Sequence, residues 1–478
     1  MVARADTKNF RKELMRSEQY FKFGKTQMQK AMDNLKNISG SELVAEIRKN
    51  NFRLTIGDVT FVLAESHGFC WGVERSVSMA YEARNFFPEK QIWGTNEIIH
   101  NPVVNKNLND LGIKFVETDV NGAKDFSVVR EGDVVLLPAF GASVDEMALL
   151  KERKVHIVDT TCPWVAKVWN SVEKSKEKGH TSIIHGKFDH EETVATKSFA
   201  EKYVVVKNME EAEYVAEYIL RGGCREEFMH KFAQAVSPDF DPDADLVKVG
   251  VANQTTMLKG ETELIGKLFE RVMIKKFGPQ DIKEHYVSFN TICDATQERQ
   301  NAMYKMFDAE YEAPSSKLYT ELEGEQIGIE LQSAKHQERL SSRAKEDETR
   351  GAAQAGTEPS SSSSSGRVDL CLVVGGFNSS NTSHLLEIAE EEGVPAFHVD
   401  REARLGGASG SANTIQHKPL GTQPSEAMAE RGLVVSEPFL PPSGRHVVIG
   451  VTSGASTPDS ITGACLQRIL AIRGLAGQ

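Results

Sequence analysis

The sequence predicts an α/β protein, and the prediction rests on two patterns along the chain. From about Thr60 to Gly278, short β-branched runs alternate with helical stretches. The runs "TFVLAES", "DVVLLPAF", "VHIVDT", "TSIIHG" and "YVVVKN" each lead into a turn and then a helix. Such alternation is typical of parallel sheets with crossover helices. The same order returns at "VDLCLVVGGFNSSNTSHLLEIAEEEG" and at "RHVVIGVTSGASTPDSITGACLQRIL".

Three other segments lack this alternation. The first fifty or so residues are polar and basic, with weak helical spacing and little to bury, so we expect a peripheral helical extension. From about 310 to 366 the chain is charged and then serine-rich, with almost no apolar residues, which predicts a disordered insert or long surface loop. Residues 401–423 are expected to form a second loop.

Composition excludes several classes of protein. A chain of 478 residues that is 40% hydrophobic can form two or three domains with proper cores. Six cysteines are too few for a disulfide framework, and no signal peptide opens the sequence, so we expect a reducing compartment. No apolar run is long enough to span a membrane. The net charge of -12 argues against a general nucleic-acid binder.

Three cysteines occupy the same kind of place, a turn between a strand and a helix. Cys70 precedes an apolar helical face that includes Val73 and Val77, and Cys162 is followed by a proline suited to a first helical turn. Cys293 lies in a similar junction. The other cysteines differ, because one lies in "RGGCREE", one inside a predicted strand and one inside a predicted helix. A lone buried cysteine is usually a small hydrophobic residue.

Such positions suit metal ligands. Open α/β sheets gather ligands at the carboxyl ends of their strands, and a helix amino terminus is expected to lower the pKa of a thiol. Three thiolates leave one metal position free. Tetrahedral zinc and a [4Fe-4S] cluster with one iron lacking a protein thiolate both fit this ligand count.

Polar residues follow several of the other predicted strands. His100 ends "NEIIH", which we expect to be a strand, and His190 and Glu192 lie in "IIHGKFDHEETVAT". Taken alone, the histidine fits a structural role and the acidic segment fits a solvated turn. A carboxyl group in a partly desolvated site could instead pass a proton to a substrate. Thr255, in "GVANQTTM", could orient or relay that proton, although alone it resembles an ordinary edge strand.

Two further turns suit an anion. In "VVGGFNSSNTSHL", glycines free the backbone, and Ser379, Ser380 and Asn381 present donors at a helix start. Ser456, in "VTSGASTPDS", repeats this arrangement. Each turn alone could be only a helix cap. Together they favour a phosphate-bearing small molecule, and neither matches a nucleotide motif.

Eight motifs in order resemble the family of 4-hydroxy-3-methylbut-2-enyl diphosphate reductases, in the form found in cyanobacteria and plastids. The resemblance runs from about Thr55 to the end, apart from the two predicted loops. It is carried by "GFCWGVERSV", "NEIIHNPVVN", "DTTCPWVAKV", "HGKFDHEETVAT", "NQTTM", "NTICDATQERQ", "GGFNSSNTSHL" and "GVTSGASTPD".

The resemblance implies three pseudo-symmetric α/β domains with parallel sheets around a central iron–sulfur cluster. The expected boundaries are an amino-terminal helical extension over 1–54 and domains over 55–158, 159–290 and 291–478, with the insert at about 311–366. It further implies a [4Fe-4S] cluster held by Cys70, Cys162 and Cys293 with one open iron.

The implied reaction is the last step of the non-mevalonate isoprenoid pathway. The substrate loses its hydroxyl group as water with the uptake of two electrons, and protonation gives isopentenyl and dimethylallyl diphosphate. In this resemblance Glu192 delivers the proton, Thr255 is its hydrogen-bonding partner, and the diphosphate is bound by a set of donors comprising His100, His190, Ser379, Ser380, Asn381 and Ser456. The implied electron donor is ferredoxin or a similar protein. The expected location is the plastid stroma, with a cyanobacterial cytoplasm as the alternative.

One position departs from the family pattern, and two rival functions stay open. Phe140 in "LLPAFGASVDE" stands where many members have histidine, so the diphosphate either has one donor fewer or gains another. The first rival is a non-catalytic iron–sulfur or zinc sensor, which would have no use for Glu192. The second is a zinc hydrolase of phosphate esters, which lacks the usual histidine-rich ligand set.

Overall fold

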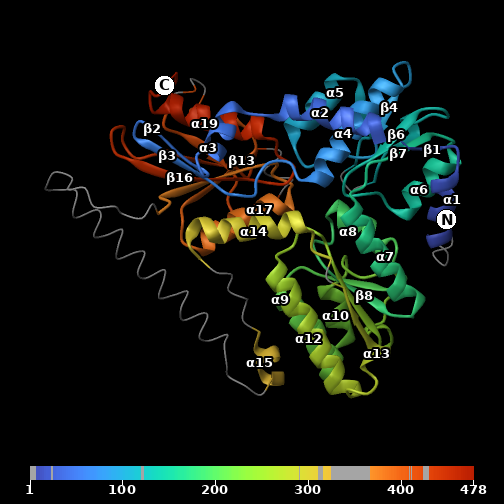
Figure 1. The fold of residues 1–478 in the computed structure, drawn as a ribbon. Helices are drawn as coiled ribbons and strands as arrows, with labels where there is room; N and C mark the ends of the chain where they lie inside the picture. Colours follow the sequence, from blue (N-terminus) through green and yellow to red (C-terminus); the bar gives the residue numbers. More distant parts are fainter. Residues whose placement is uncertain are drawn as a thin grey trace. The chain divides into compact units, whose positions relative to one another are not determined.

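A computed structural model describes residues 7–22, 25–119, 123–289, 291–309, 316–323, 367–407, 410, 412–423 and 430–477 (Figure 1). The chain divides into two compact units. The first unit comprises Met1–Ile38, Cys70–Asp294 and Ser316–Gly324, and the second unit comprises Ser39–Phe69, Ala295–Ser315 and Glu325–Gln478. Each unit contains parallel sheet with helices between the strands, so the predicted α/β class is confirmed.

The first unit contains two wholly parallel sheets. One has the order β1-β7-β6-β4-β5, with strands β1 (Tyr20–Phe21), β4 (Ile92–Gly94), β5 (Ile113–Phe115), β6 (Val134–Leu137) and β7 (His156–Asp159). Its chain segment also contains helices α1 (Thr7–Arg16), α2 (Lys25–Ser39), α4 (Trp71–Phe86), α5 (Pro102–Asp110) and α6 (Val144–Glu152) and the 3-10 turn η2 (Phe126–Val128).

The amino-terminal segment is more than a peripheral extension. Tyr20 and Phe21 add a parallel edge strand beside Ile157 and Val158 of β7. Leu14 is only 2% exposed and belongs to the hydrophobic core of this sheet. The expectation that the segment has little to bury is therefore wrong. Its few apolar side chains are separated by charged residues, so the sequence shows no clear apolar face. The sheet residues that bury them, such as those of β7, are far away in sequence.

The second sheet of the first unit has the order β11-β10-β8-β9. Its strands are β8 (Thr181–His185), β9 (Tyr203–Val206), β10 (Val249–Asn253) and β11 (Tyr286–Ser288). Its helices are α7 (Pro163–Glu177), α8 (Glu191–Lys197), α9 (Met209–Arg221), α10 (Arg225–Lys231), α11 (Pro242–Asp245), α12 (Lys259–Phe277) and α13 (Ile282–His285). Because β10 is paired on both sides and wholly buried, the edge-strand interpretation of "GVANQTTM" is wrong.

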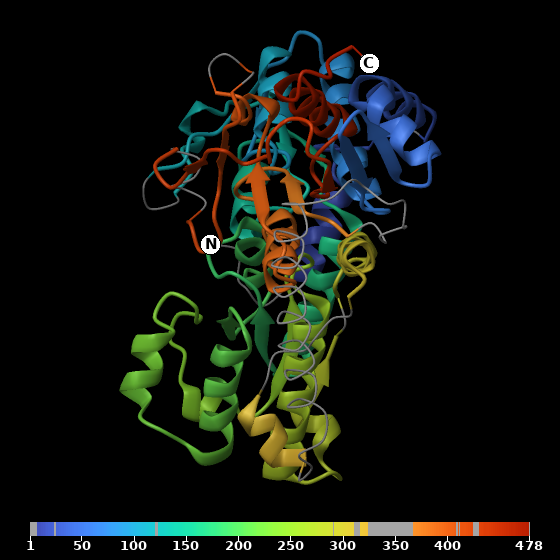
Figure 2. The same ribbon diagram turned by 90° about the vertical axis from the view of Figure 1, so that its left-hand side faces the viewer.

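Part of the predicted insert is helical. Helix α15 (Lys317–Glu323) lies beside α12, as Figure 2 shows, and the Arg271 guanidinium stands 4.3 Å from the centre of the Tyr319 ring. The rest of the predicted 311–366 insert lies outside the described residues.

The second unit contains a mixed sheet with the order β13-β12-β16-β3-β2. Its strands are β2 (Arg53–Ile56), β3 (Val59–Leu63), β12 (Leu370–Val374), β13 (Ala396–Val399) and β16 (Val447–Ser453), all parallel except for the antiparallel β2–β3 pair. Its helices are α3 (Glu42–Lys49), α14 (Asp294–Phe307), α17 (Ser380–Glu391) and α19 (Asp459–Ile472), with the 3-10 turn η3 (Glu402–Arg404).

Two features of this unit differ from the sequence prediction. Strand β3, which the predicted boundaries group with 55–158, pairs with β16 almost four hundred residues further along the chain. Residues 401–423 are not only loop, because β14 (Ile415–His417) forms an antiparallel pair with β15 (Val434–Ser436).

In the described part of the chain, no helix is both long enough and apolar enough to cross a membrane.

Candidate active site

The three cysteines stand at helix starts, as the sequence predicts. Cys70 is the N-cap of α4, and its Sγ accepts a hydrogen bond from the Val73 amide at 3.4 Å. Cys162 follows β7 and precedes the first residue of α7. Cys293 follows β11 and precedes α14. All three belong to the first unit. Cys371 and Cys465 are buried inside β12 and α19, whereas Cys224 is exposed between two helices.

Interactions of several kinds link the segments that carry the three cysteines to one carboxyl group. A Cβ atom built on Gly72 would stand 2.6 Å from the sulfur of Cys162 and 4.0 Å from that of Cys70, so both sulfurs face the missing side chain of this glycine. The field of Glu192 reaches Cys162. Glu192 in turn binds Thr255, whose carbonyl accepts a hydrogen bond from the Cys293 amide at 3.3 Å. The fold thus gathers residues that are more than two hundred positions apart.

Burial outweighs the helix terminus at Cys162. Desolvation raises the pKa of the Cys162 thiol to about 11, while the amides of Trp164 and Val165 lower it by less. The expected lowering of the pKa by a helix amino terminus is therefore wrong for this thiol. The reason is that an isolated thiolate is poorly stabilised in a dry site. A bound cation would change this balance, because a coordinating thiol is deprotonated by its metal.

The spacing of the sulfurs bears on which metal group fits. Zn–S bonds of about 2.3 Å in a tetrahedral site would place the sulfurs about 3.8 Å apart. Among the described residues, the three thiol sulfurs do not form a group whose atoms all lie within 4.8 Å of one another. A multi-metal cluster does not need them that close, because each thiolate binds a different metal atom. A set of three thiols is thus compatible with an iron–sulfur cluster.

Glu192 and Thr255 form a buried pair. Glu192 is 3% exposed, and its two carboxyl oxygens accept hydrogen bonds from the Thr255 amide at 2.6 Å and the Thr255 hydroxyl at 2.9 Å. Burial raises the pKa of Glu192 to about 7, although these two hydrogen bonds and His100 lower it in part. A carboxyl group with this pKa can hold or release a proton near neutral pH.

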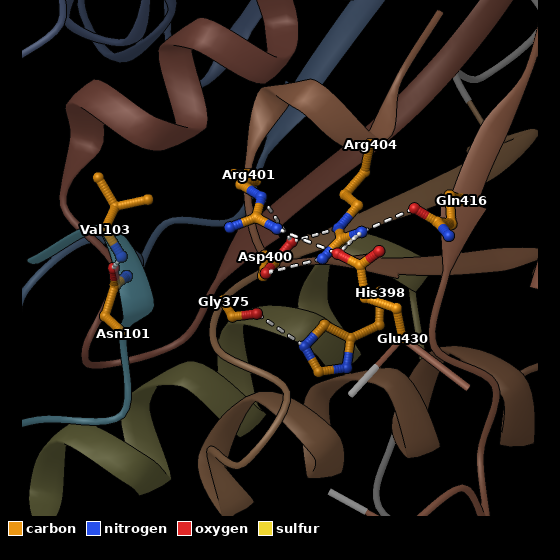
Figure 3. A network of polar contacts seen from close by, with 9 residues as sticks. All are labelled: Asn101, Val103, Gly375, His398, Asp400, Arg401, Arg404, Gln416 and Glu430. Atoms are coloured by element: carbon orange, nitrogen blue, oxygen red, sulfur yellow. Dashed lines mark hydrogen bonds and ion pairs between the residues drawn. The ribbon is translucent and has the colours of Figure 1, made fainter. Parts of the chain in front are cut away.

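His100 lies in an irregular segment instead of a strand. The strand is β4, which ends at Gly94, and the two isoleucines before His100 are buried without sheet pairing. The next residue, Asn101, caps α5 by accepting from the amides of Val103 and Val104, each at 3.1 Å (Figure 3). The strand prediction for "NEIIH" is thus wrong, because apolar residues can be buried by packing alone.

Phe140 packs against this histidine. The rings of His100 and Phe140 are stacked, with centroids 4.6 Å apart and planes 11° apart. His190 meets His100 edge-on at 5.1 Å. The position where many family members carry a histidine therefore supplies an aromatic face that orients His100 without donating a hydrogen bond.

Three carboxylates raise the pKa of His100. Burial lowers the pKa of His100, but Glu191, Glu97 and Glu192 together raise it above its ordinary value. The Nε2 atom of His100 is 3.6 Å from Glu191, and its Nδ1 atom is 3.9 Å from Glu97. In contrast, burial and the neighbouring His100 lower the pKa of His190 to about 3. The carboxylates thus favour the charged form of His100, whereas burial keeps His190 neutral.

This group resembles a metal site in composition but not in hydrogen bonding. His100, His190 and Glu191 have donor atoms within 4.8 Å of one another. However, Nδ1 of His190 accepts from the Glu192 amide at 3.2 Å, so the ring proton lies on Nε2. A protonated Nε2 donates and cannot ligate a cation, so His190 suits an anionic oxygen. The carboxylates beside His100 raise its pKa and so favour the form in which both ring nitrogens donate.

The polar residues at the start of α17 gather in the second unit. Ser379 is the N-cap, and its hydroxyl oxygen accepts from the amide and the hydroxyl of Thr382 at 3.3 and 2.9 Å. Asn381 accepts from the Ala455 amide at 3.0 Å, which brings the loop that carries Ser456 beside the helix start. Ser380 is buried, and its hydroxyl has no hydrogen-bond partner among the described residues. Such a hydroxyl is available to an anion.

Sequence reasoning assigned no role to two carboxylates of this site, Glu97 and Glu191. Glu191 precedes Glu192 at the start of α8, and successive helical residues point about 100° apart. One carboxylate can therefore contact His100 while its neighbour contacts Thr255. Two acidic residues in succession at a helix start are the sequence feature that could have pointed to Glu191. The groups that each carboxylate contacts, however, depend on segments that are distant in sequence.

Comparison with known proteins identifies many relatives. The model of a family described as LytB protein matches residues 61–313 and 339–470. A 4-hydroxy-3-methylbut-2-enyl diphosphate reductase of Thermosynechococcus vestitus is 50% identical over 471 residues, which cover 98% of this chain and 99% of that protein. A protein of the same name from Synechocystis sp. is 51% identical over 433 residues, or 91% and 95% of the two chains.

A solved structure supports the fold. The E-1-hydroxy-2-methyl-but-2-enyl-4-diphosphate reductase of Plasmodium falciparum aligns with a TM-score of 0.52 at 19% identity, covering 87% of this chain and 88% of that chain. At this identity the likeness concerns the fold alone. The fold and the sequence relationship agree with each other.

Proposed function

The chain belongs to the LytB family, and we propose that it reduces 4-hydroxy-3-methylbut-2-enyl diphosphate to isopentenyl diphosphate and dimethylallyl diphosphate. The relatives named above carry this activity in their names and span nearly the whole chain. The observation that most supports the proposal is the set of interactions that links Gly72, Cys162, Glu192, Thr255 and Cys293. In the proposal the three cysteines bind the metal group, and Glu192, whose pKa is about 7, releases the proton.

The cofactor in this proposal is a [4Fe-4S] cluster held by Cys70, Cys162 and Cys293. Three thiols that do not all lie within 4.8 Å of one another are compatible with a cluster, in which each thiolate binds a different iron atom. Such a cluster would supply two electrons and an iron without a protein ligand as a Lewis acid for the substrate hydroxyl. The missing side chain at Gly72 leaves the sulfurs of Cys70 and Cys162 uncovered.

Glu192 is the proton donor in this proposal, and Thr255 positions it. The Thr255 amide and hydroxyl hold both carboxyl oxygens, so the carboxyl plane has one orientation. The site is buried, which keeps bulk water from protonating or hydrolysing reactive species. Because the pKa is about 7, a large share of Glu192 is protonated at neutral pH.

In this proposal the diphosphate is the ligand of the donors that the family resemblance implies, which are His100, His190, Ser379, Ser380, Asn381 and Ser456. His190 would donate from Nε2. Hydrogen bonds from a charged donor are about twice as strong as neutral ones, and the neighbouring carboxylates favour the charged form of His100 by raising its pKa. The raised pKa of His100 offers an answer to the donor lost at Phe140.

The electron donor is proposed to be ferredoxin or a similar small protein. The relatives described above come from cyanobacteria, which supports a photosynthetic setting. Localisation in a plastid stroma stays a prediction from the sequence, as do the three domain boundaries.

Metal analysis tests the proposal first. Protein purified without oxygen should contain iron and sulfide, and Cys162→Ala should lose most of both. Cys224→Ala is the matched control, because this thiol is exposed and lies outside the cysteine group. Zinc in place of iron, or equal iron in the two variants, would contradict the cluster assignment.

A second measurement separates the reductase from a non-catalytic sensor. Glu192→Gln should keep the visible absorption of the cluster and lose turnover, because glutamine preserves the shape of the side chain but cannot donate the proton. Full activity in this variant would refute the assigned role of Glu192.

A further inference from the structure

We propose that Lys418 is a positioning residue for diphosphate binding, because its buried ammonium group holds the turn that presents Ser379 and Ser380. The turn comprises residues 375–379 and joins β12 to α17; we call it the β12–α17 turn. This inference rests on the proposed function. Lys418 lies in the segment after β14 that the sequence predicts as a loop, and no motif in the chain draws attention to it.

The ammonium group contacts both ends of the junction. Lys418 is only 5% exposed, and its Nζ donates to the Phe377 carbonyl in the turn at 2.9 Å. It also donates to the Ser383 hydroxyl in the first helical turn of α17 at 3.3 Å. One side chain therefore fixes the distance between the turn and the helix that follows it. Ser379 and Ser380 lie between these two contacts.

The backbone of Lys418 is fixed as well. Its amide donates to the His398 carbonyl at 2.9 Å, which ties it to β13. His398 is fully buried, and its Nε2 donates to the Gly375 carbonyl at 2.9 Å, as Figure 3 shows. Burial, with a contribution from Lys418, lowers the pKa of His398 to about 3, so this ring is neutral. His398 and Lys418 each donate a hydrogen bond to a carbonyl of the β12–α17 turn, and of these two side chains only the lysine ammonium is positively charged.

The Phe377 ring is held from two sides. It meets the His398 ring edge-on at 5.2 Å, and the Arg404 guanidinium lies 5.5 Å from its centre. Figure 3 shows Arg404 between Asp400, Gln416 and Glu430. The guanidinium donates hydrogen bonds to these three side chains at 2.8, 2.7 and 2.9 Å. With its ring enclosed, Phe377 keeps its carbonyl directed at Lys418.

The other side of the turn has no spare room. A Cβ atom on Gly375 would stand 2.5 Å from the Thr382 hydroxyl, and one on Gly454 would stand 2.0 Å from it. Thr382 in turn donates to Ser379. If the Lys418 contacts were lost, we expect the β12–α17 turn to move toward the space that the lysine occupied, because Thr382 fills the space on its other side.

A positive charge at this place has a specific use. A buried ammonium group is costly unless it is hydrogen-bonded, and a neutral side chain could fill the same volume at lower cost. Here both bonds go to the segment that presents the anion-binding hydroxyls. A diphosphate at those hydroxyls would be attracted by the charge behind them, since burial weakens solvent screening.

The test measures anion binding and catalysis on the anaerobic holoenzyme. Inorganic pyrophosphate is titrated by calorimetry into wild type, Lys418→Met and the control Lys90→Met. Lys90 is a suitable control because its Nζ also donates to a main-chain carbonyl, that of Gly132 at 3.0 Å, and also contacts a histidine. These two partners, Gly132 and His156, are not candidate site residues. Visible absorption reports whether the cluster is intact in each protein.

We expect Lys418→Met to bind pyrophosphate about ten-fold or more weakly, which corresponds to ~1.4 kcal/mol. The KM for substrate should rise by a similar factor while kcat changes much less, because the reacting end of the substrate is not affected. Lys90→Met should bind as wild type does. If Lys418→Met does not fold, Lys418→Gln replaces it under the same criteria.

Two results would overturn the inference. One is wild-type pyrophosphate affinity in folded Lys418→Met, and the other is a fall in kcat with unchanged KM. In either case, normal wild-type turnover would leave the proposed function intact. A wild-type holoenzyme that fails to reduce the substrate would instead contradict the proposed function, and this inference with it.

Discussion

Replacing Thr255 by valine should shift the pH dependence of catalysis toward alkaline pH. The Thr255 hydroxyl donates to one oxygen of Glu192 at 2.9 Å, while its amide donates to the other at 2.6 Å. Valine removes the first donor and keeps the second. Because both donors favour the charged carboxylate, losing one makes the proton harder to remove.

The size of the shift follows from the strength of that hydrogen bond. A hydrogen bond to a charged group contributes about 1.5–3 kcal/mol, and one pKa unit corresponds to about 1.36 kcal/mol. The pKa of Glu192, about 7 in the wild-type protein, should therefore rise by about one to two units in Thr255→Val. If Glu192 acts as an acid, activity declines as pH rises through this pKa. The declining limb should move to higher pH by the same amount.

The assay is the pH profile of kcat with the anaerobic holoenzyme, normalised to the maximum of each protein. Normalisation removes any loss of absolute rate caused by the missing hydroxyl. Thr256→Val is the matched control, because the Thr256 hydroxyl accepts from the side chain of Gln254 at 2.8 Å instead of binding Glu192. An unchanged limb in Thr255→Val, or one moved to lower pH, would refute the role of Thr255 as a donor to the catalytic carboxylate.

Three further predictions concern stability and cofactor binding. Since burial raises the pKa of Glu192 from 4.5 to about 7, the stability contributed by its protonated form is lost as pH rises between these values. Glu192→Gln should thus be more stable than wild type at pH 8, by up to roughly 3 kcal/mol, and the advantage should vanish near pH 4.5 in thermal unfolding. Leu14→Ala should cost about 2–4 kcal/mol in unfolding free energy, and no change would contradict the buried position of this leucine. Gly72→Ala should lower the iron content, since the new methyl group would meet the Cys162 sulfur at 2.6 Å, whereas Gly266→Ala in α12 should retain iron.

Much of the local structure could be predicted because neighbours in sequence determine it. The strand and helix runs around Cys70 and Cys162 have the periodicity and the turn residues of a parallel α/β unit. The donors at the start of α17 were visible for the same reason, since a helix start has a local signature. Where burial came from distant segments, local patterns were misleading. "NEIIH" looked like a strand, and the segment that contains the buried Leu14 looked as if it had little to bury.

The sequence by itself determined the α/β class, the three equivalent cysteine positions and the family. These depend on residue order and on patterns that span only a few turns or strands. The tertiary structure alone decided which strands pair, as in β3 with β16, and which groups share an environment. It placed Glu192 against Thr255, stacked Phe140 on His100 and enclosed Lys418 beneath the β12–α17 turn. Desolvation and charge coupling act through space, so the raised pKa values of Glu192 and His100 arise only once distant segments meet.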